Sequence, residues 1–248
     1  MVTGMGQSDA GKEDFERVLE GGAELQRHLP WLQLVVVGGA MAALHANHRY
    51  SLDTDHVSQS VHDWYDEVIG HLESWDGWET KRTRRPFLIL GERHHVQLGI
   101  RQQRGTTELD VERLRGMWVP TAAEALRIKV FMVTDRKATR DYLDVAALAD
   151  MLGTEGSDEA LRTLNVHYPG EGNQTCATKF ADYSQQDPVD LPKVDLKMYR
   201  ALKPPYDDWR YLRETVSELG HRLLAQEMEG YLRPGKQGGG EGKGGVTP

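Results

Sequence analysis

The feature that most constrains the fold of this chain is a short apolar run that ends in two glycines. Residues 32–37 read Leu-Gln-Leu-Val-Val-Val, and Gly38-Gly39 and an Ala-, Met- and Leu-rich stretch at 40–46 follow directly. A β-branched run bounded by glycine is typical of a buried strand, whereas alanine and leucine favour helix. The sequence therefore predicts a strand, a tight turn and a helix in immediate succession.

A pair of aspartates follows this unit. Residues 50–57 alternate in polarity, which predicts a second strand, and Asp53 and Asp55 lie two positions apart within it. Side chains two apart on a strand point to the same face, so the carboxylates would lie side by side. A divalent cation removes their repulsion, and Mg²⁺ prefers such oxygen ligands. A helix that opens with Gly38-Gly39 offers backbone N–H groups to phosphate. Together these features predict phosphoryl or nucleotidyl transfer.

The other periodic segments divide the chain into a mixed half and a helical half. Residues 13–29 predict a helix interrupted near Gly21-Gly22, and a three- and four-residue apolar spacing predicts a helix over 61–75. Thr121 and Glu124 form a capping box that starts the helical half. Further strands are expected at 78–81, 87–90, 96–100 and 108–111, and further helices at 142–152, 158–164, 177–183, 196–202 and 209–224.

We therefore expect an α+β fold, with a mixed sheet and helices followed by a helical C-terminal half. The Gly/Ser/Asp-rich segment 1–12 is expected to be flexible, and the Gly- and Lys-rich tail 234–248 to be disordered. Between them, we place an α/β domain at 13–118 and a helical domain at 119–233.

Composition excludes several classes of protein. A single cysteine, Cys176, excludes an intrachain disulfide framework and the cysteine spacing of a zinc ribbon. The longest apolar runs are far shorter than the roughly 20 residues that span a bilayer. The first residues lack the hydrophobic segment of a secretory signal. We expect a cytoplasmic protein without membrane contact.

The distribution of charge matters more than its sum. The formal net charge of −8 argues against a nucleic-acid partner. Residues 81–140, however, contain 14 Lys and Arg against 6 Asp and Glu. This basic segment, with Arg82, Arg84 and Arg85 at its start, leaves room for an RNA partner held locally.

Two blocks of residues carry a resemblance to a known family. Residues 35–40 (Val-Val-Val-Gly-Gly-Ala) and 48–55 (His-Arg-Tyr-Ser-Leu-Asp-Thr-Asp) resemble the first motif of the AbiEii/AbiGii group of nucleotidyltransferase-like toxins. This group lies within the DNA-polymerase-β-like nucleotidyltransferase superfamily. Lys129, Arg136, Arg140-Asp141 and Asp144 resemble a later Lys…Arg…Arg-Asp-x-x-Asp block of the same group. The resemblance covers roughly residues 33–150 and implies a nucleotidyltransferase-like sheet domain.

The resemblance also implies roles for individual residues. Mg²⁺ would be bound by Asp53 and Asp55, with Asp110 as the best candidate for the third carboxylate that polymerase-like members take from a later strand. Lys129 would contact phosphates, and Asp144 would complete the site from the helical half. The nucleoside triphosphate (NTP) would be held by Gly38, Gly39, Arg49 and Ser51.

The resemblance implies an activity as well. The chain would transfer a nucleotide from an NTP to an acceptor, the 3′ end of tRNA in that group, as the toxin of a toxin–antitoxin or abortive-infection pair with a cognate antitoxin. Many relatives carry Ser or Thr after the glycine pair, where this chain has Ala40 and Met41. This departure motivates one alternative, a catalytically silent RNA- or partner-binding regulator. A second alternative, with a different acceptor, is an aminoglycoside-type small-molecule nucleotidyltransferase. Arg140 and Asp144, four residues apart, would also fit a plain surface ion pair.

Overall fold

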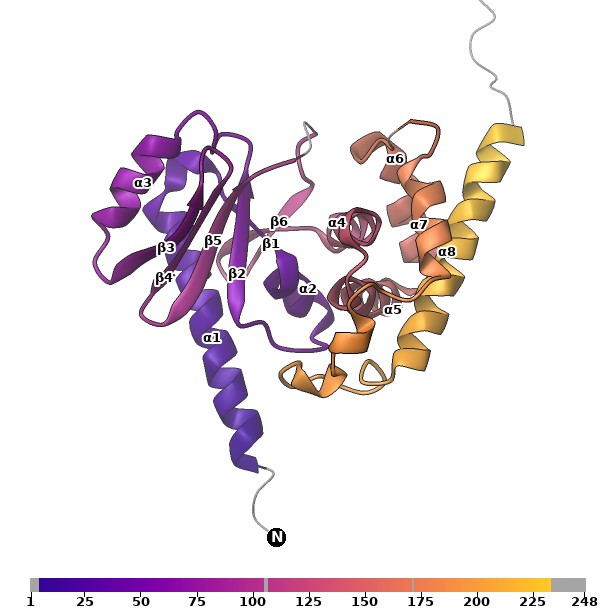
Figure 1. Cartoon of the computed structure of the whole chain (residues 1–248), viewed down its shortest axis with the longest axis horizontal. Helices are drawn as coiled ribbons and strands as arrows, with labels where there is room; N and C mark the ends of the chain where they lie inside the picture. Colours follow the sequence, from indigo (N-terminus) through magenta and orange to yellow (C-terminus); the bar gives the residue numbers. More distant parts are fainter. Residues whose placement is uncertain (1–4, 105–106, 171, 233–248) are drawn as a thin grey trace, which may run out of the picture.

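The computed structural model describes residues 5–104, 107–170 and 172–232. Its N-terminal half is built on a five-stranded mixed sheet (Figure 1). The strand order is β1-β2-β5-β4-β3; β2 and β5 are parallel, and the other neighbouring pairs are antiparallel. The strands are β1 (Val35–Val37), β2 (Asp53–Ser58), β3 (Trp78–Arg84), β4 (Leu88–Arg93) and β5 (Val96–Gln102).

One face of this sheet is covered by α1 (Met5–His28) and α3 (Tyr65–Glu73), which enclose a core cluster with β4 and β5. α1 runs through Gly21-Gly22 without the break that the sequence predicts. A Cβ at Gly21 would lie 3.0 Å from Val96 Cγ1, and one at Gly22 would lie 3.1 Å from Thr54 Cγ2. The two glycines therefore allow close packing of the helix on the sheet. α1 also begins at Met5, inside the segment expected to be flexible.

The second core cluster joins the two halves of the chain. It contains residues of β1, of α2 (Gly38–Ala46) and of the later helices α4 (Ala122–Arg136) and α5 (Thr139–Leu161). A two-stranded ribbon, β6 (Val111–Leu114) and β7 (Met117–Pro120), lies between the halves in sequence and contributes Met117 and Val119 to this cluster. The boundary expected at residue 118 thus falls within a strand whose side chains pack into a shared core.

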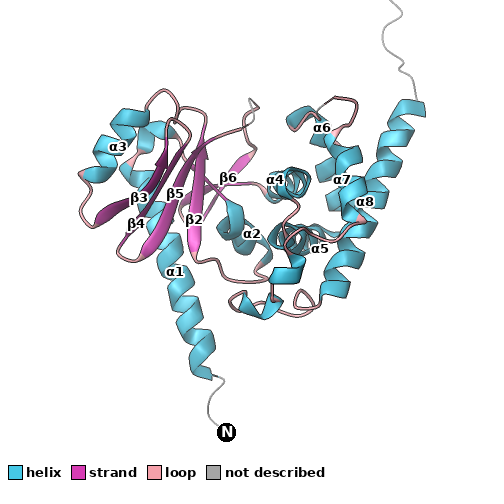
Figure 2. Ribbon diagram, in the orientation of Figure 1, coloured by secondary structure: helices cyan, strands magenta, loops and turns pink. Residues whose placement is uncertain are grey.

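The C-terminal half is helical, as expected, and the α+β fold class is confirmed (Figure 2). Thr121 caps α4 by accepting a hydrogen bond from the Glu124 N–H at 3.3 Å. α5 continues through a kink at Gly153, and the helix expected at 196–202 is only a 3₁₀ turn, Leu196–Met198. The remaining helices are α6 (Leu164–His167), α7 (Cys176–Ser184) and α8 (Trp209–Leu232). None of the helices in the described part of the chain combines the length and apolarity needed to cross a membrane.

Candidate active site

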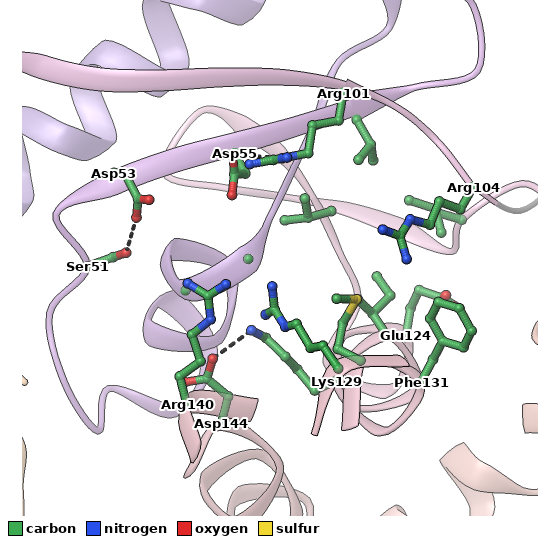
Figure 3. Close-up of a pocket in the computed structure, with 18 of the residues that line it drawn as sticks. Ser51, Asp53, Asp55, Arg101, Arg104, Glu124, Lys129, Phe131, Arg140 and Asp144 are labelled. Carbon is green, nitrogen blue, oxygen red and sulfur yellow. Dashed lines mark hydrogen bonds and ion pairs between the residues drawn. The ribbon is translucent and has the colours of Figure 1, made fainter. Parts of the chain in front are cut away.

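A cavity of about 680 Å³ lies between the sheet and the helical half. Its walls come from the turn between β1 and α2, from β2 and β5, from α4 and α5, and from residues 198–200. Figure 3 shows the two sides of the cavity: Asp53 and Asp55 on β2, and Lys129, Arg140 and Asp144 on the helices opposite. Of the residues to which the resemblance assigns a role, all except Asp110 line this cavity.

The aspartate pair lies on β2, as the alternation of residues 50–57 predicts. Asp53 is paired with Gln97 of β5 and Asp55 with Gly99, so both carboxylates share the cavity face of the sheet. Ser51 Oγ donates to Asp53 Oδ1 at 3.0 Å, and Arg101 Nε donates to Asp55 Oδ1 at 3.1 Å. A Cβ at position 99 would overlap Asp55 Oδ1. Glycine on the neighbouring strand is therefore what leaves room for this carboxylate.

The two glycines form the turn into α2. Gly38 has φ +76°, in the left-handed region that favours glycine, and Gly38 and Gly39 are the first residues of the helix. A Cβ at Gly39 would lie 2.8 Å from Arg49 Nη2 and 2.9 Å from Ser51 Oγ. The free N–H groups at the start of α2 thus border the cavity.

Ala40 and Met41, which depart from the family pattern, are fully buried in the core and do not line the cavity. The absence of a hydroxyl at these two positions therefore changes nothing on the cavity wall. The departure that motivates a silent binding protein has no counterpart in the geometry of the site.

Asp144 organises a buried cluster of charges opposite the aspartate pair. Arg49 donates to both of its oxygens, from Nε at 3.0 Å and from Nη2 at 3.1 Å. His48 Nε2 lies 2.9 Å from Asp144 Oδ1, and Lys129 Nζ lies 2.6 Å from Asp144 Oδ2. Burial alone would raise the pKa of Asp144, but Arg49, Lys129 and His48 hold it far below its ordinary value. Asp144 is thus an ionised carboxylate that fixes its cationic neighbours.

Lys129 is almost fully buried and borders the cavity. Its second acidic neighbour is Asp141, whose Oδ1 lies 3.6 Å from Lys129 Nζ. Asp141 in turn accepts two hydrogen bonds from Arg136, at 2.6 and 2.7 Å. Lys129, Arg136, Asp141 and Asp144 of the later sequence block therefore form one connected network of ions.

Arg140 differs from these cations. Its side chain is exposed and lines the cavity, and no carboxylate within the described ranges lies within the 4.0 Å of an ion pair. The expectation of a surface ion pair between Arg140 and Asp144 is therefore wrong, because the Asp144 carboxylate binds His48, Arg49 and Lys129 in the buried cluster. Arg140 leaves one positive charge available to a ligand on the helical wall.

Asp110 is not brought to the aspartate pair. The strand expected at 108–111 begins only at Val111, and the Asp110 carboxylate accepts a 2.6 Å hydrogen bond from Arg127 Nη2. The same nitrogen donates to Glu124 Oε2 at 2.6 Å. Carboxylate and ring atoms of Asp110, Glu124 and His167 lie within 4.8 Å of one another. Arg127 already supplies the cation in this group, so Asp110 serves a structural ion pair here.

Several residues of the site were not assigned from the sequence. Arg101 binds Asp55, and His48 binds Asp144. Tyr199 and Arg200 line the cavity from a late segment of the chain, and the Arg49 guanidinium lies 5.5 Å from the centre of the Tyr199 ring. Arg101 lies two residues after Gly99, the partner of Asp55 on β5, so its side chain is on the face of Asp55. Only the pairing of β2 with β5 would have revealed this neighbour.

The chemistry of the donor set fits a divalent cation. Two carboxylates share one face of β2, and only one oxygen of each accepts a hydrogen bond from the described side chains. Asp53 Oδ2 and Asp55 Oδ2 therefore remain as oxygen ligands on the cavity side, of the type that Mg²⁺ prefers. No carboxylate stands on β5 opposite the pair, where the partners are Gln97 and Gly99.

Comparisons with known proteins agree on the fold. The sequence matches no protein-family model and no curated protein. Among solved structures, the chain is similar to a putative nucleotidyltransferase from H. pylori, with 18% identity and a TM-score of 0.51 over 89% of this chain and 96% of that one. It is also similar to MenT4, a nucleotidyltransferase toxin from Mycobacterium tuberculosis H37Rv, with 17% identity and a TM-score of 0.53 over 88% of each chain. The chain has the nucleotidyltransferase fold.

Proposed function

We propose that this chain is a nucleotidyltransferase that moves a nucleotide from an NTP to an acceptor with Mg²⁺. One observation carries the proposal: the Asp53 and Asp55 carboxylates and a cationic helical wall face each other across one cavity. Nucleotidyl transfer needs this combination, because catalysis of phosphoryl chemistry rests on positioning and on neutralising phosphate charge.

The residues of the chain would divide the work between them. The N–H groups of Gly38 and Gly39 and the charge of Arg140 would hold the triphosphate. Asp53 and Asp55 would hold Mg²⁺, which supplies neutralisation of the developing charge and activation of the acceptor hydroxyl. The acceptor hydroxyl would lose its proton to solvent as its oxygen forms a bond to the α-phosphorus. The bond from that phosphorus to the bridging oxygen would break, and its electron pair would leave with pyrophosphate. Lys129, fixed by Asp144, would add positive charge near the phosphates.

We further propose that the acceptor is the 3′ end of tRNA and that the chain is the toxin of a toxin–antitoxin pair. The similarity to MenT4, a nucleotidyltransferase toxin, supports the toxin role. The basic segment 81–140 supports a nucleic-acid acceptor. A cognate antitoxin is the protein partner that this role requires.

The test is transfer from each of four α-labelled NTPs to total tRNA in the presence of Mg²⁺. Labelled tRNA with the wild-type chain, and none with Asp53→Ala, supports the proposal. The matched control is Asp63→Ala, which removes an exposed aspartate outside the cavity. Label on total protein or on an aminoglycoside, with none on tRNA, would show that the acceptor is not tRNA. No transfer to any acceptor would favour the silent binding protein.

A further inference from the structure

The cavity face of the sheet continues beyond the aspartate pair to the edge strand. The register places Asp55 of β2 in one row with Gly99 of β5, Leu90 of β4 and Arg82 of β3. Residues directly opposite on paired strands point to the same face, so Arg82 lies on the face of Asp55. At about 4.8 Å per strand, the two positions are about 14 Å apart.

A second row adds two more arginines. It runs from Val57 of β2 through Arg101 of β5 and Leu88 of β4 to Arg84 of β3. Arg101 lines the cavity, and Arg84 lies two strands away, at about 10 Å. Arg82 and Arg84 are two residues apart on β3 and therefore share this face. We call Arg82, Arg84 and Arg101 the arginine strip.

This part of the sheet face lies outside both hydrophobic clusters. Ile89 packs into the cluster under α1 and α3, so its neighbours Leu88 and Leu90 point to the opposite face. Neither Leu88 nor Leu90 belongs to either core cluster. Arg82 and Arg84 are exposed, and no acidic side chain in the described ranges pairs with them. Figure 1 shows β3 at the end of the sheet remote from the helical half.

The charge on this face is uneven along the strands. The row of Asp53 continues through Gln97 to Glu92 and then Glu79, and Glu79 binds Lys81 at 2.6 Å. On this face, acidic side chains therefore lie at the beginning of β3, and the arginines Arg82 and Arg84 lie at its end. A polyanion on this face would be guided over the arginine strip and away from Glu79 and Glu92.

We propose that the arginine strip binds the sugar–phosphate backbone of the RNA acceptor and leads its 3′ end to Asp53 and Asp55. The inference rests on the proposed function, since it takes the acceptor to be RNA. Arg82 and Arg84 are exposed arginines without acidic partners among the described residues, and they share the sheet face of Arg101 and the cavity, so the strip complements a chain of phosphates. The contacts are to phosphates, so the strip would bind RNA with little sequence preference.

The test is binding of a fluorescently labelled tRNA transcript, without NTP, by the double variant R82E/R84E. The matched control is R210E/R213E, which makes the same charge change on two exposed arginines of α8, at the other end of the molecule (Figure 1). We expect R82E/R84E to weaken binding at least tenfold at low salt and R210E/R213E less than threefold. The slope of log affinity against log salt should fall by about 1.5–2 for R82E/R84E, because two phosphate contacts are lost.

The proposed role of the arginine strip would be overturned if R82E/R84E bound tRNA as tightly as wild type. It would also be overturned if R210E/R213E lost as much affinity as R82E/R84E. Full displacement of the tRNA by a phosphoserine peptide of the same charge would overturn its assignment to RNA. Thermal melting within a few degrees of wild type confirms that the variant is folded. Failure of the proposed function would give a different result. The wild-type chain would still bind tRNA through the arginine strip, but it would transfer no nucleotide to it.

Discussion

Arg49 and Asp144 lie 95 positions apart in the chain and form a two-bonded ion pair, with nitrogen–oxygen distances of 3.0 and 3.1 Å. Arg49 belongs to the loop that leads to the aspartate pair, and Asp144 belongs to α5 of the helical half. The pair is buried, with Asp144 fully so. It ties the position of the sheet carboxylates to the helical wall.

The aspartate pair is expected to be essential for transfer. Asp53→Asn and Asp55→Asn should each reduce nucleotidyl transfer at least 100-fold, because each removes a charged ligand at the site of developing phosphate charge. Initial rates at saturating NTP and tRNA measure the effect, with Asp63→Asn as the control. Activity of either variant within threefold of wild type would argue against a role of that carboxylate.

Gly99 is expected to act through Asp55. Gly99→Ala places a Cβ against Asp55 Oδ1, so the carboxylate must move and transfer should fall at least tenfold. Gly70→Ala in α3 is the matched control, because nothing lies within 4 Å of its new Cβ. It should keep full activity and gain about 0.5–1 kcal/mol of unfolding free energy. Equal activity of the two variants would show that Asp55 needs no fixed position.

Asp144 is expected to be a major determinant of stability. Asp144→Asn leaves Arg49 buried without its counter-ion and Lys129 with only Asp141 at 3.6 Å, which should lower the unfolding free energy by about 3–5 kcal/mol. Asp66→Asn breaks an exposed pair with Arg85 and should cost at most about 1 kcal/mol. Urea unfolding followed by circular dichroism compares the two. A loss in Asp144→Asn no larger than that in Asp66→Asn would mean that the buried cluster contributes little to stability.

The Asp144 carboxylate also makes the stability of the fold depend on pH. The folded chain keeps Asp144 charged because its pKa is lowered, whereas the unfolded chain takes up a proton near the ordinary value of about 4. The unfolded state binds more protons, so stability falls as the pH drops from about 5 to about 3.

The contribution of Asp144 can be isolated by comparing slopes. Asp144→Asn should lose less unfolding free energy than wild type over this pH range, and parallel curves would contradict the assignment. Burial lowers the pKa of His48, the titratable neighbour of Asp144. His48 in the unfolded chain titrates near 6.5, so its effect begins at higher pH.

Local patterns predicted the part of the site that is local in the chain. The strand, the glycine turn and the alternation of Asp53 and Asp55 need only neighbouring residues, and the structure places them as expected. The break expected at Gly21-Gly22 failed because packing against Val96 and Thr54 outweighs the low helix propensity of glycine. β7 was missed because four residues ending in Pro120 carry little strand signal.

Roles that depend on strand pairing or on distant segments could not be predicted. Asp110 was expected beside the aspartate pair because polymerase-like members take a third carboxylate from a later strand, whereas here it precedes β6 and pairs with Arg127. Arg101 was not assigned because its place beside Asp55 follows from the parallel pairing of β2 with β5. The contact of Asp144 with Arg49 depends on how the helical half packs on the sheet, which no local pattern encodes.

The segment around Tyr199 closes the loop that carries Arg49. The Tyr50 N–H donates to the Arg200 carbonyl at 2.9 Å, the Lys203 N–H donates to the His48 carbonyl at 2.9 Å, and Arg200 reaches Asp14 of α1 at 2.5 Å. These partners are made late in translation, long after the aspartate pair has left the ribosome. A nascent chain that already contains Asp53 and Asp55 therefore lacks the finished cavity until residues 199–203 have been made.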